Sequence, residues 1–145
     1  MQTTSKTQNN NSKNTNDMNT NNTQTQAIEI FNYELQCNQR QIEKAKEQLA
    51  ENFTHYFPWV AEQLYKNELV CVYVQRILRD MQEESAELVI RYRIEQNEQF
   101  LGQVYNVRKD SSGTMHRECS LWEYQTCLSF NQWLRQTAKQ LKIQL

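Results

Sequence analysis

The sequence is poor in the residues that build flexible loops and many catalytic sites, with two glycines, one proline and two histidines among 145 residues. Loops that wrap around phosphate groups depend on glycine, and neither G-x-G-x-x-G nor G-x-x-x-x-G-K-S/T occurs. The zinc-protease motif H-E-x-x-H is missing as well. These absences exclude nucleotide binding by a glycine-rich loop and leave no recognisable signature for a cofactor, a metal or catalysis.

Long hydrophobic runs and a signal sequence are missing too. No apolar run approaches the ~20 residues that span a bilayer, and the N-terminus has neither a basic start nor an apolar stretch. We therefore expect a soluble, cytoplasmic protein without a membrane partner. Cysteines form no C-x-x-C pair and fall within apolar segments, which favours their burial in a reducing compartment. They are Cys37, Cys71, Cys119 and Cys127.

A change in composition divides the chain at Gln26/Ala27. Residues 1–26 contain eight Asn, seven Thr and four Gln but no aromatic, Ile, Leu or Val. Short polar side chains cannot offset a backbone ordering entropy of ~1 to 2 kcal/mol per residue, so we predict that this leader is disordered. Residues 27–145 have the length and apolar content of a single domain.

The first part of that domain has helical periodicity. Four apolar residues recur seven apart and predict a helix over residues 27–52. They are Ile28, Leu35, Ile42 and Leu49. The apolar stripe is narrow, which leaves two alternatives, namely packing within the chain and a coiled-coil homodimer.

A second helix is predicted from Pro58 to about residue 84, because proline suits the first position of a helix. Within it, the β-branched segment 69–74 could alternatively be a buried strand. The aromatic segment 55–59 is expected either to cap the end of this helical hairpin or to form a partner-binding hot spot.

Alternating apolar residues predict three antiparallel strands after this helical hairpin, over residues 88–95, 100–109 and 114–119. Matching their apolar faces places Tyr92 across from Gly102, so that the ring covers the bare glycine backbone. Ser120 and Glu123 fit the capping box S-x-x-E and begin a C-terminal helix. The predicted fold is therefore α+β: two helices, a three-stranded meander and a third helix.

One face of the predicted sheet mixes aliphatic, aromatic and arginine side chains, a composition typical of recognition surfaces. Its proposed partner-binding residues are Arg91, Arg93, Leu101, Tyr105 and Val107. Sheet-edge pairing with an extended peptide is one mode of binding that would suit them. The alternative is that a helix covers this face.

Sites of other kinds have weaker support in the sequence. His116, Cys119 and Cys127 are the nearest approach to a metal site, but positions 116 and 119 face opposite sides of a strand. A nucleophilic pair of Cys119 or Cys127 with His55 has no local signature and could form only through the fold. Basic residues of the hairpins, with Tyr105 for stacking, would suit a nucleic-acid-binding regulator, although acidic and basic residues nearly balance, 17 against 16.

The Asn/Gln-rich leader, the Gln-rich helices and the scarcity of glycine and proline resemble the composition of small accessory and assembly proteins of cyanobacteria. This resemblance implies no particular site. It agrees with the function that we expect, a non-enzymatic protein-interaction module that acts as a monomer or homodimer and docks a peptide or subunit of a larger assembly. A nucleic-acid-binding regulator and a small enzyme without a recognisable motif are the alternatives.

Overall fold

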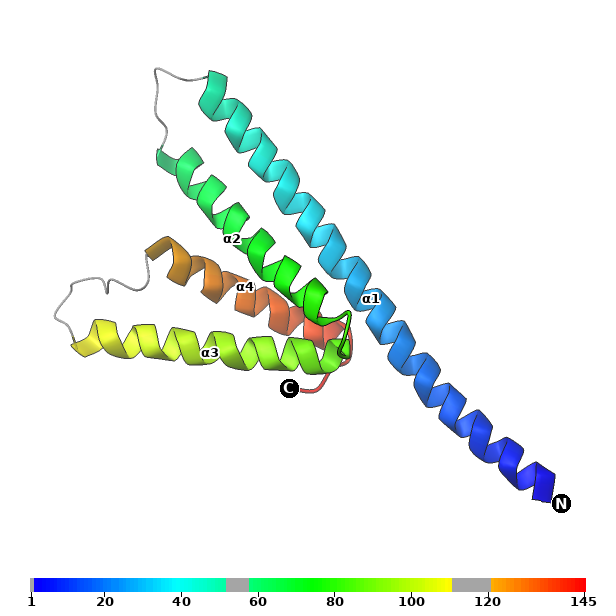
Figure 1. The fold of residues 1–145 in the computed structure, drawn as a ribbon. Helices are drawn as coiled ribbons and strands as arrows, with labels where there is room; N and C mark the ends of the chain where they lie inside the picture. Colours follow the sequence, from blue (N-terminus) through cyan, green and yellow to red (C-terminus); the bar gives the residue numbers. More distant parts are fainter. Residues whose placement is uncertain (1, 52–57, 111–120) are drawn as a thin grey trace.

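The computed structural model describes residues 2–51, 58–110 and 121–145, with side chains described over 21–51, 58–104 and 121–145. It contains α1 (Gln2–Glu51), α2 (Pro58–Asp80), α3 (Ala86–Asp110) and α4 (Leu121–Gln140) (Figure 1). Within these ranges the protein is all-helical and has no strand. The predicted α+β fold with a three-stranded meander is therefore wrong.

The error lies in α3, where two strands were predicted over residues 88–95 and 100–109. Residues buried on α3 follow the spacing i, i+3, i+4 and i+8 of one helical face, and they are Ala86, Val89, Ile90 and Ile94. Ser85 caps the helix, because its Oγ accepts a hydrogen bond from the Leu88 amide at 3.3 Å. The third predicted strand, 114–119, lies outside the described residues.

Two periodicities overlap in this segment, which explains the wrong prediction. Ile90 and Ile94 lie four residues apart, a spacing that fits one face of a strand as well as one face of a helix. Leu88 and Tyr92 continue the alternation of a strand, yet the structure leaves them 56% and 53% exposed, while Val89 is 2% exposed. Burial of the adjacent pair Val89 and Ile90 is the pattern of a helix.

Gly102 provides a direct test of this helix. It lies inside α3, and a Cβ built on it would meet no atom within 4 Å, so Tyr92 does not cover it as the strand pairing predicted. Glycine in an exposed helix interior costs about 0.5–1 kcal/mol relative to alanine. We expect Gly102→Ala to raise the free energy of unfolding by that amount in urea denaturation, whereas an unchanged or lowered value would contradict a helical position 102.

α1 is longer than predicted and passes through Gln26/Ala27 without a break. Gln24, on the leader side of that border, contacts the turn between α2 and α3. Its Nε2 donates to the Met81 carbonyl at 2.8 Å, and its Oε1 accepts from the Ala86 amide at 2.6 Å. Side-chain contacts thus begin before Ala27 and include Gln24, while disorder in the part of the leader that precedes Gln24 stays a prediction.

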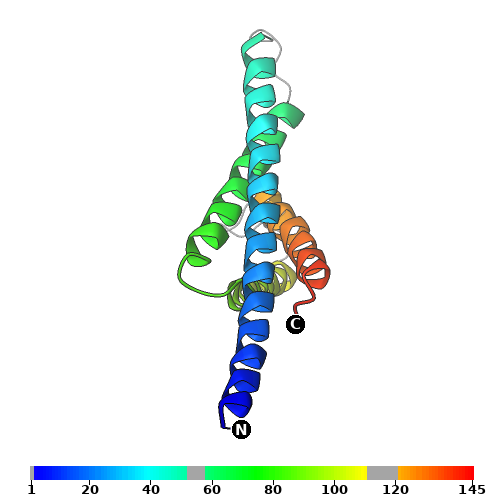
Figure 2. The ribbon, with the colours of Figure 1, turned by 90° about the vertical axis from the view of Figure 1, so that its right-hand side faces the viewer.

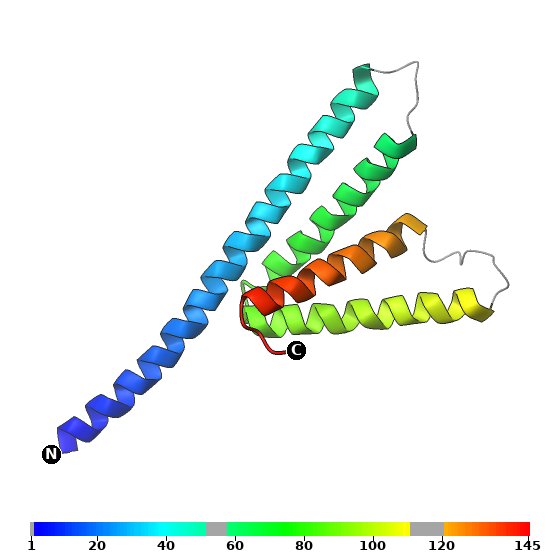
Figure 3. The same ribbon diagram turned by 180° about the vertical axis from the view of Figure 1, so that it is seen from behind.

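In the structure α1 packs against other helices of the same chain, which is one of the two alternatives that the sequence left open for it. α2 lies antiparallel beside it (Figures 1 and 3) and begins at Pro58 as expected. Phe31, Asn38 and Ala45 are buried on α1 at intervals of seven residues. The ambiguous segment 69–74 is helical, with Cys71 and Val74 buried.

The second antiparallel pair, α3 and α4, meets the first pair at the C-terminal end of α2, partway along α1, and diverges from it toward the N-terminal end of α2 (Figures 1 and 3). Viewed along another direction, α2 and α4 lie on either side of α1 (Figure 2). Asn97 donates to Asn131 at 3.3 Å within the α3–α4 pair, and Arg135 forms an ion pair with Glu98. These polar contacts fix the register of α3 against α4.

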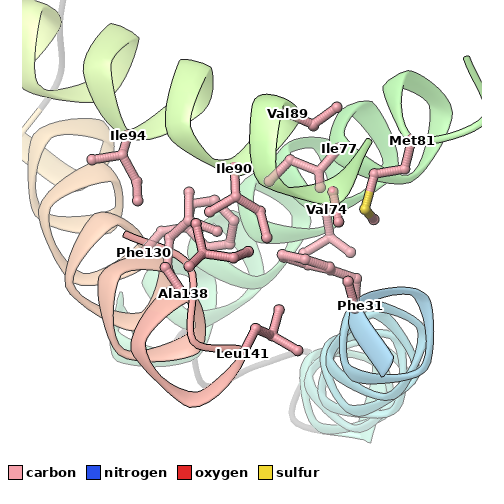
Figure 4. Close-up of a cluster of buried hydrophobic side chains, with 14 residues drawn as sticks. Phe31, Val74, Ile77, Met81, Val89, Ile90, Ile94, Phe130, Ala138 and Leu141 are labelled. Atoms are coloured by element: carbon pink, nitrogen blue, oxygen red, sulfur yellow. The ribbon is translucent and has the colours of Figure 1, made fainter. Parts of the chain in front are cut away.

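The main hydrophobic core lies where the two pairs meet and draws on all four helices (Figure 4). Phe31 contributes from α1, Ile77 from α2, Ile90 from α3 and Leu134 from α4, each at most 1% exposed. Among the residues that the structure describes, no helix has the length and apolar character that crossing a membrane requires.

Candidate functional site

The structure does not bring Arg91 and Arg93 together, although both were predicted on one sheet face. Residues two apart on a helix point in nearly opposite directions. Arg91 donates to the Gln144 carbonyl through Nη2 at 2.6 Å and forms an ion pair with Glu87. Arg93 is bound instead to Asp80 of α2, with 2.8 Å between Nη2 and Oδ2.

The other predicted partner-binding residues also lie on α3. Leu101 is half-buried, and Tyr105 and Val107 belong to the helix but lie beyond its described side chains. The mixed face of a sheet that linked these residues does not exist. A role for any one of them in partner binding stays a prediction.

Candidate residues for chemistry are dispersed or outside the described chain. Cys127 is buried in α4, whereas His55, His116 and Cys119 lie outside the described residues. In the ranges with described side chains, no three potential ligands gather as a metal site would need. Cys71 is buried, and desolvation, followed by the nearby carboxylate of Glu68, raises the pKa of its thiol.

A hollow of about 520 Å³ lies at the α2–α3 corner. We use this name for the last residue of α2, the turn that follows it and the first two turns of α3. Residues from all three parts line the hollow: Asp80, Glu83, Glu84, Leu88, Val89, Tyr92 and Arg93.

Two large apolar side chains at the corner are more than half exposed. Leu88 and Tyr92 lie four residues apart on α3 and are therefore neighbours on the helix surface. Val89 turns into the core beside them and is 2% exposed. Scattered exposed leucines are ordinary, but an adjacent apolar pair beside a hollow is typical of a protein-binding surface.

The charges around this pair are mostly negative. Asp80 forms ion pairs with both Arg93 and Arg79, and the Arg93 guanidinium also lies 5.6 Å from the centre of the Tyr92 ring. Glu83 and Glu84 are exposed, and neither carboxylate has an ion-pair partner among the described residues. The lining of the hollow therefore carries a net charge of −2.

The backbone of the corner is held in place from two sides. Gln24 of α1 bonds the Met81 carbonyl and the Ala86 amide, and Ser85 caps α3 through the Leu88 amide. These bonds occupy polar groups that a turn would otherwise leave to water. Because its frame is fixed before binding, the corner loses little conformational entropy when a partner docks.

A second hollow, of about 380 Å³, lies between α1 and α4. Tyr33, which is 65% exposed, and the half-buried Trp133 contribute aromatic rings to it. Glu29 and Glu34 are its charged residues. It has a single strongly exposed apolar residue rather than an adjacent pair, and it provides a control surface for experiments on the corner.

Sequence reasoning missed Leu88 and Tyr92 because it placed both on the buried face of a strand. A helical reading of the same residues would have placed them together on the face opposite Ile90 and Ile94. Comparisons of the chain with protein-family models, with curated proteins and with solved structures gave no match. The arrangement of the corner is therefore the observation on which function must be argued.

Proposed function

We propose that this protein is a non-enzymatic interaction module, an adaptor or assembly factor, that binds a protein partner at the α2–α3 corner. The observation that carries this proposal is the adjacent, more than half exposed pair Leu88 and Tyr92 beside a hollow with a fixed backbone. Tyrosine is one of the residue types enriched among the few side chains that dominate the binding free energy at protein interfaces, and Leu88 extends the apolar surface beside it.

The electrostatics of the corner favour a protein partner over a nucleic acid. Glu83 and Glu84 would repel phosphate groups that approached Leu88 and Tyr92. Arg91 and Arg93, two of the basic residues considered for nucleic-acid contact, point to different sides of α3 and are bound to groups of the chain itself. No observation in the described residues favours the nucleic-acid alternative.

The proposal predicts that Leu88→Ser/Tyr92→Ser reduces partner capture at least tenfold, because the loss of two anchors costs more than about 1.4 kcal/mol of binding free energy. The matched control is Tyr33→Ser/Leu128→Ser, which replaces the same residue types at exposed positions outside the corner. Quantitative mass spectrometry of affinity purifications from the cells that make the protein measures the difference.

All four side chains are partly exposed, so both double variants should retain the melting temperature of the wild type within a few degrees. Circular dichroism checks this. Equal capture of every associated protein by the corner variant and the wild type would show that the corner is not the docking site.

A further inference from the structure

We infer that the segment that docks at the α2–α3 corner is basic and apolar, with an arginine or lysine next to a large apolar side chain. This inference rests on the proposed function and names the chemistry of the partner. The corner has two features that such a segment would satisfy together, an exposed apolar pair and two carboxylates without ion-pair partners among the described residues.

The carboxylates select the charge of the partner. Glu83 and Glu84 are adjacent in the turn and line the hollow beside the apolar pair. Arg93 and Arg79 both pair with Asp80, and neither forms an ion pair with Glu83 or Glu84 among the described residues. A partner that covers Leu88 and Tyr92 also removes water from the carboxylates, which makes an unpaired acid costly and a charge-assisted hydrogen bond from arginine or lysine favourable.

The apolar surface selects the second element of the partner. Ligand pockets of proteins typically have volumes of about 300–1,000 Å³, and the corner hollow of about 520 Å³ falls within that range. A leucine, phenylalanine or tryptophan side chain could enter it and cover the exposed parts of Leu88 and Tyr92. Burial of apolar area on the protein and on its partner contributes a favourable free energy of roughly 25 cal/mol per Å², before the entropic cost of binding is subtracted.

The limited extent of exposed apolar surface at the corner favours a short partner segment over a large partner surface. Apolar exposure is concentrated on two adjacent turns of α3, where the next outward residues, Glu95 and Gln99, are polar. The Gln24 contacts hold the turn on the other side of the hollow. A partner therefore gains most from one apolar anchor and one or two cationic side chains, spaced to reach Leu88 and Glu84 together.

Selection from a displayed library of random dodecapeptides tests this inference without knowledge of the natural partner. The full chain is the bait, and the library is first depleted on Leu88→Ser/Tyr92→Ser. We expect the enriched peptides to pair arginine or lysine with a large apolar residue. Their affinity, measured by fluorescence anisotropy, should fall with rising salt concentration because exposed charge pairs are screened.

Charge variants then identify the carboxylates that contribute. Glu83→Gln/Glu84→Gln is expected to weaken binding of the selected peptides about tenfold, as the loss of hydrogen bonds to charged groups predicts. Glu43→Gln/Glu47→Gln removes two exposed acids of α1, away from the corner, and should leave the affinity unchanged.

The outcomes separate this inference from the proposed function. Enriched peptides that depend on Leu88 and Tyr92 but are acidic or uncharged would overturn the basic partner and leave the docking site intact. If the selected peptides bound the wild type and Glu83→Gln/Glu84→Gln with equal affinity, that result would also overturn the inference of a basic partner and leave the docking site intact. If no peptide binds the wild type better than the Leu88→Ser/Tyr92→Ser variant, the docking site itself is wrong.

Discussion

Phe31→Ala is expected to lower the free energy of unfolding by about 3–5 kcal/mol, the range found when a buried aromatic side chain is truncated to alanine. Phe31 is fully buried in the core where the two helix pairs meet (Figure 4). Its ring packs edge-on against Trp133 of α4, with 5.5 Å between ring centres and an interplanar angle of 80°.

The large effect follows from the position of Phe31 between helices that do not otherwise approach closely. In the described chain, the backbones of α1 and α4 do not approach closely, so the contact between these helices depends on side chains such as Phe31 and Trp133. Truncation leaves a cavity that rigid helices cannot fill by a small shift.

Urea denaturation followed by circular dichroism measures this loss. Tyr33→Ala is the matched control, because Tyr33 lies two residues along the same helix and is 65% exposed. It should change the free energy of unfolding by less than about 0.5 kcal/mol. A loss of less than 1 kcal/mol for Phe31→Ala, on the scale of surface substitutions, would mean that α1 does not pack on α4 as described.

The second large effect distinguishes the helix α3 from the predicted strand. Ile90→Ala should cost about 2–5 kcal/mol of unfolding free energy, since Ile90 is fully buried. Tyr92→Ala should cost little, because the side chain of Tyr92 is 53% exposed. In a strand, these two residues would lie on the same face and would respond alike.

Val89→Ala completes this comparison. Val89 is 2% exposed in the helix, whereas the strand reading placed it on the face opposite Ile90. We expect both Val89→Ala and Ile90→Ala to destabilise the protein in thermal denaturation, with the larger effect for the larger side chain. If Tyr92→Ala destabilised the protein and Val89→Ala did not, the result would support the predicted strand over residues 88–95 and contradict the helix α3.

Helix prediction succeeded where a single periodicity was present. The spacing of Ile28, Leu35, Ile42 and Leu49 indicated a helix, and α1 spans these residues, although its buried positions are Ala27, Phe31, Asn38 and Ala45. Proline at residue 58 marked the start of α2 because its ring suits the first turn. The C-terminal helix was expected after Ser120, and α4 begins at Leu121.

Prediction failed in residues 86–110 because the apolar residues fit two periods. Leu88, Ile90, Tyr92 and Ile94 alternate, and nothing in their identity shows that only Ile90 and Ile94 are buried. Tertiary packing against α4 and the Ser85 cap decide the outcome. The candidate site depended on that outcome, since only a helix turns Leu88 and Tyr92 outward together.

Gln24 shows a second limit of composition-based reasoning. Its neighbours are Asn and Thr, so the sequence places it in a leader without tertiary contacts. In the structure its amide bonds both the Met81 carbonyl and the Ala86 amide, groups 57 and 62 residues away. A contact of this range leaves no local pattern in the sequence.

Backbone NMR of residues 86–104 tests the central claim most directly, because the docking site exists only if this segment is helical. The structure predicts Cα chemical shifts displaced in the helical direction throughout the segment, with NOEs between Hα of each residue and the amide three residues later. Cα shifts displaced in the opposite direction over residues 88–95, with NOEs across a turn at 96–98, would contradict it.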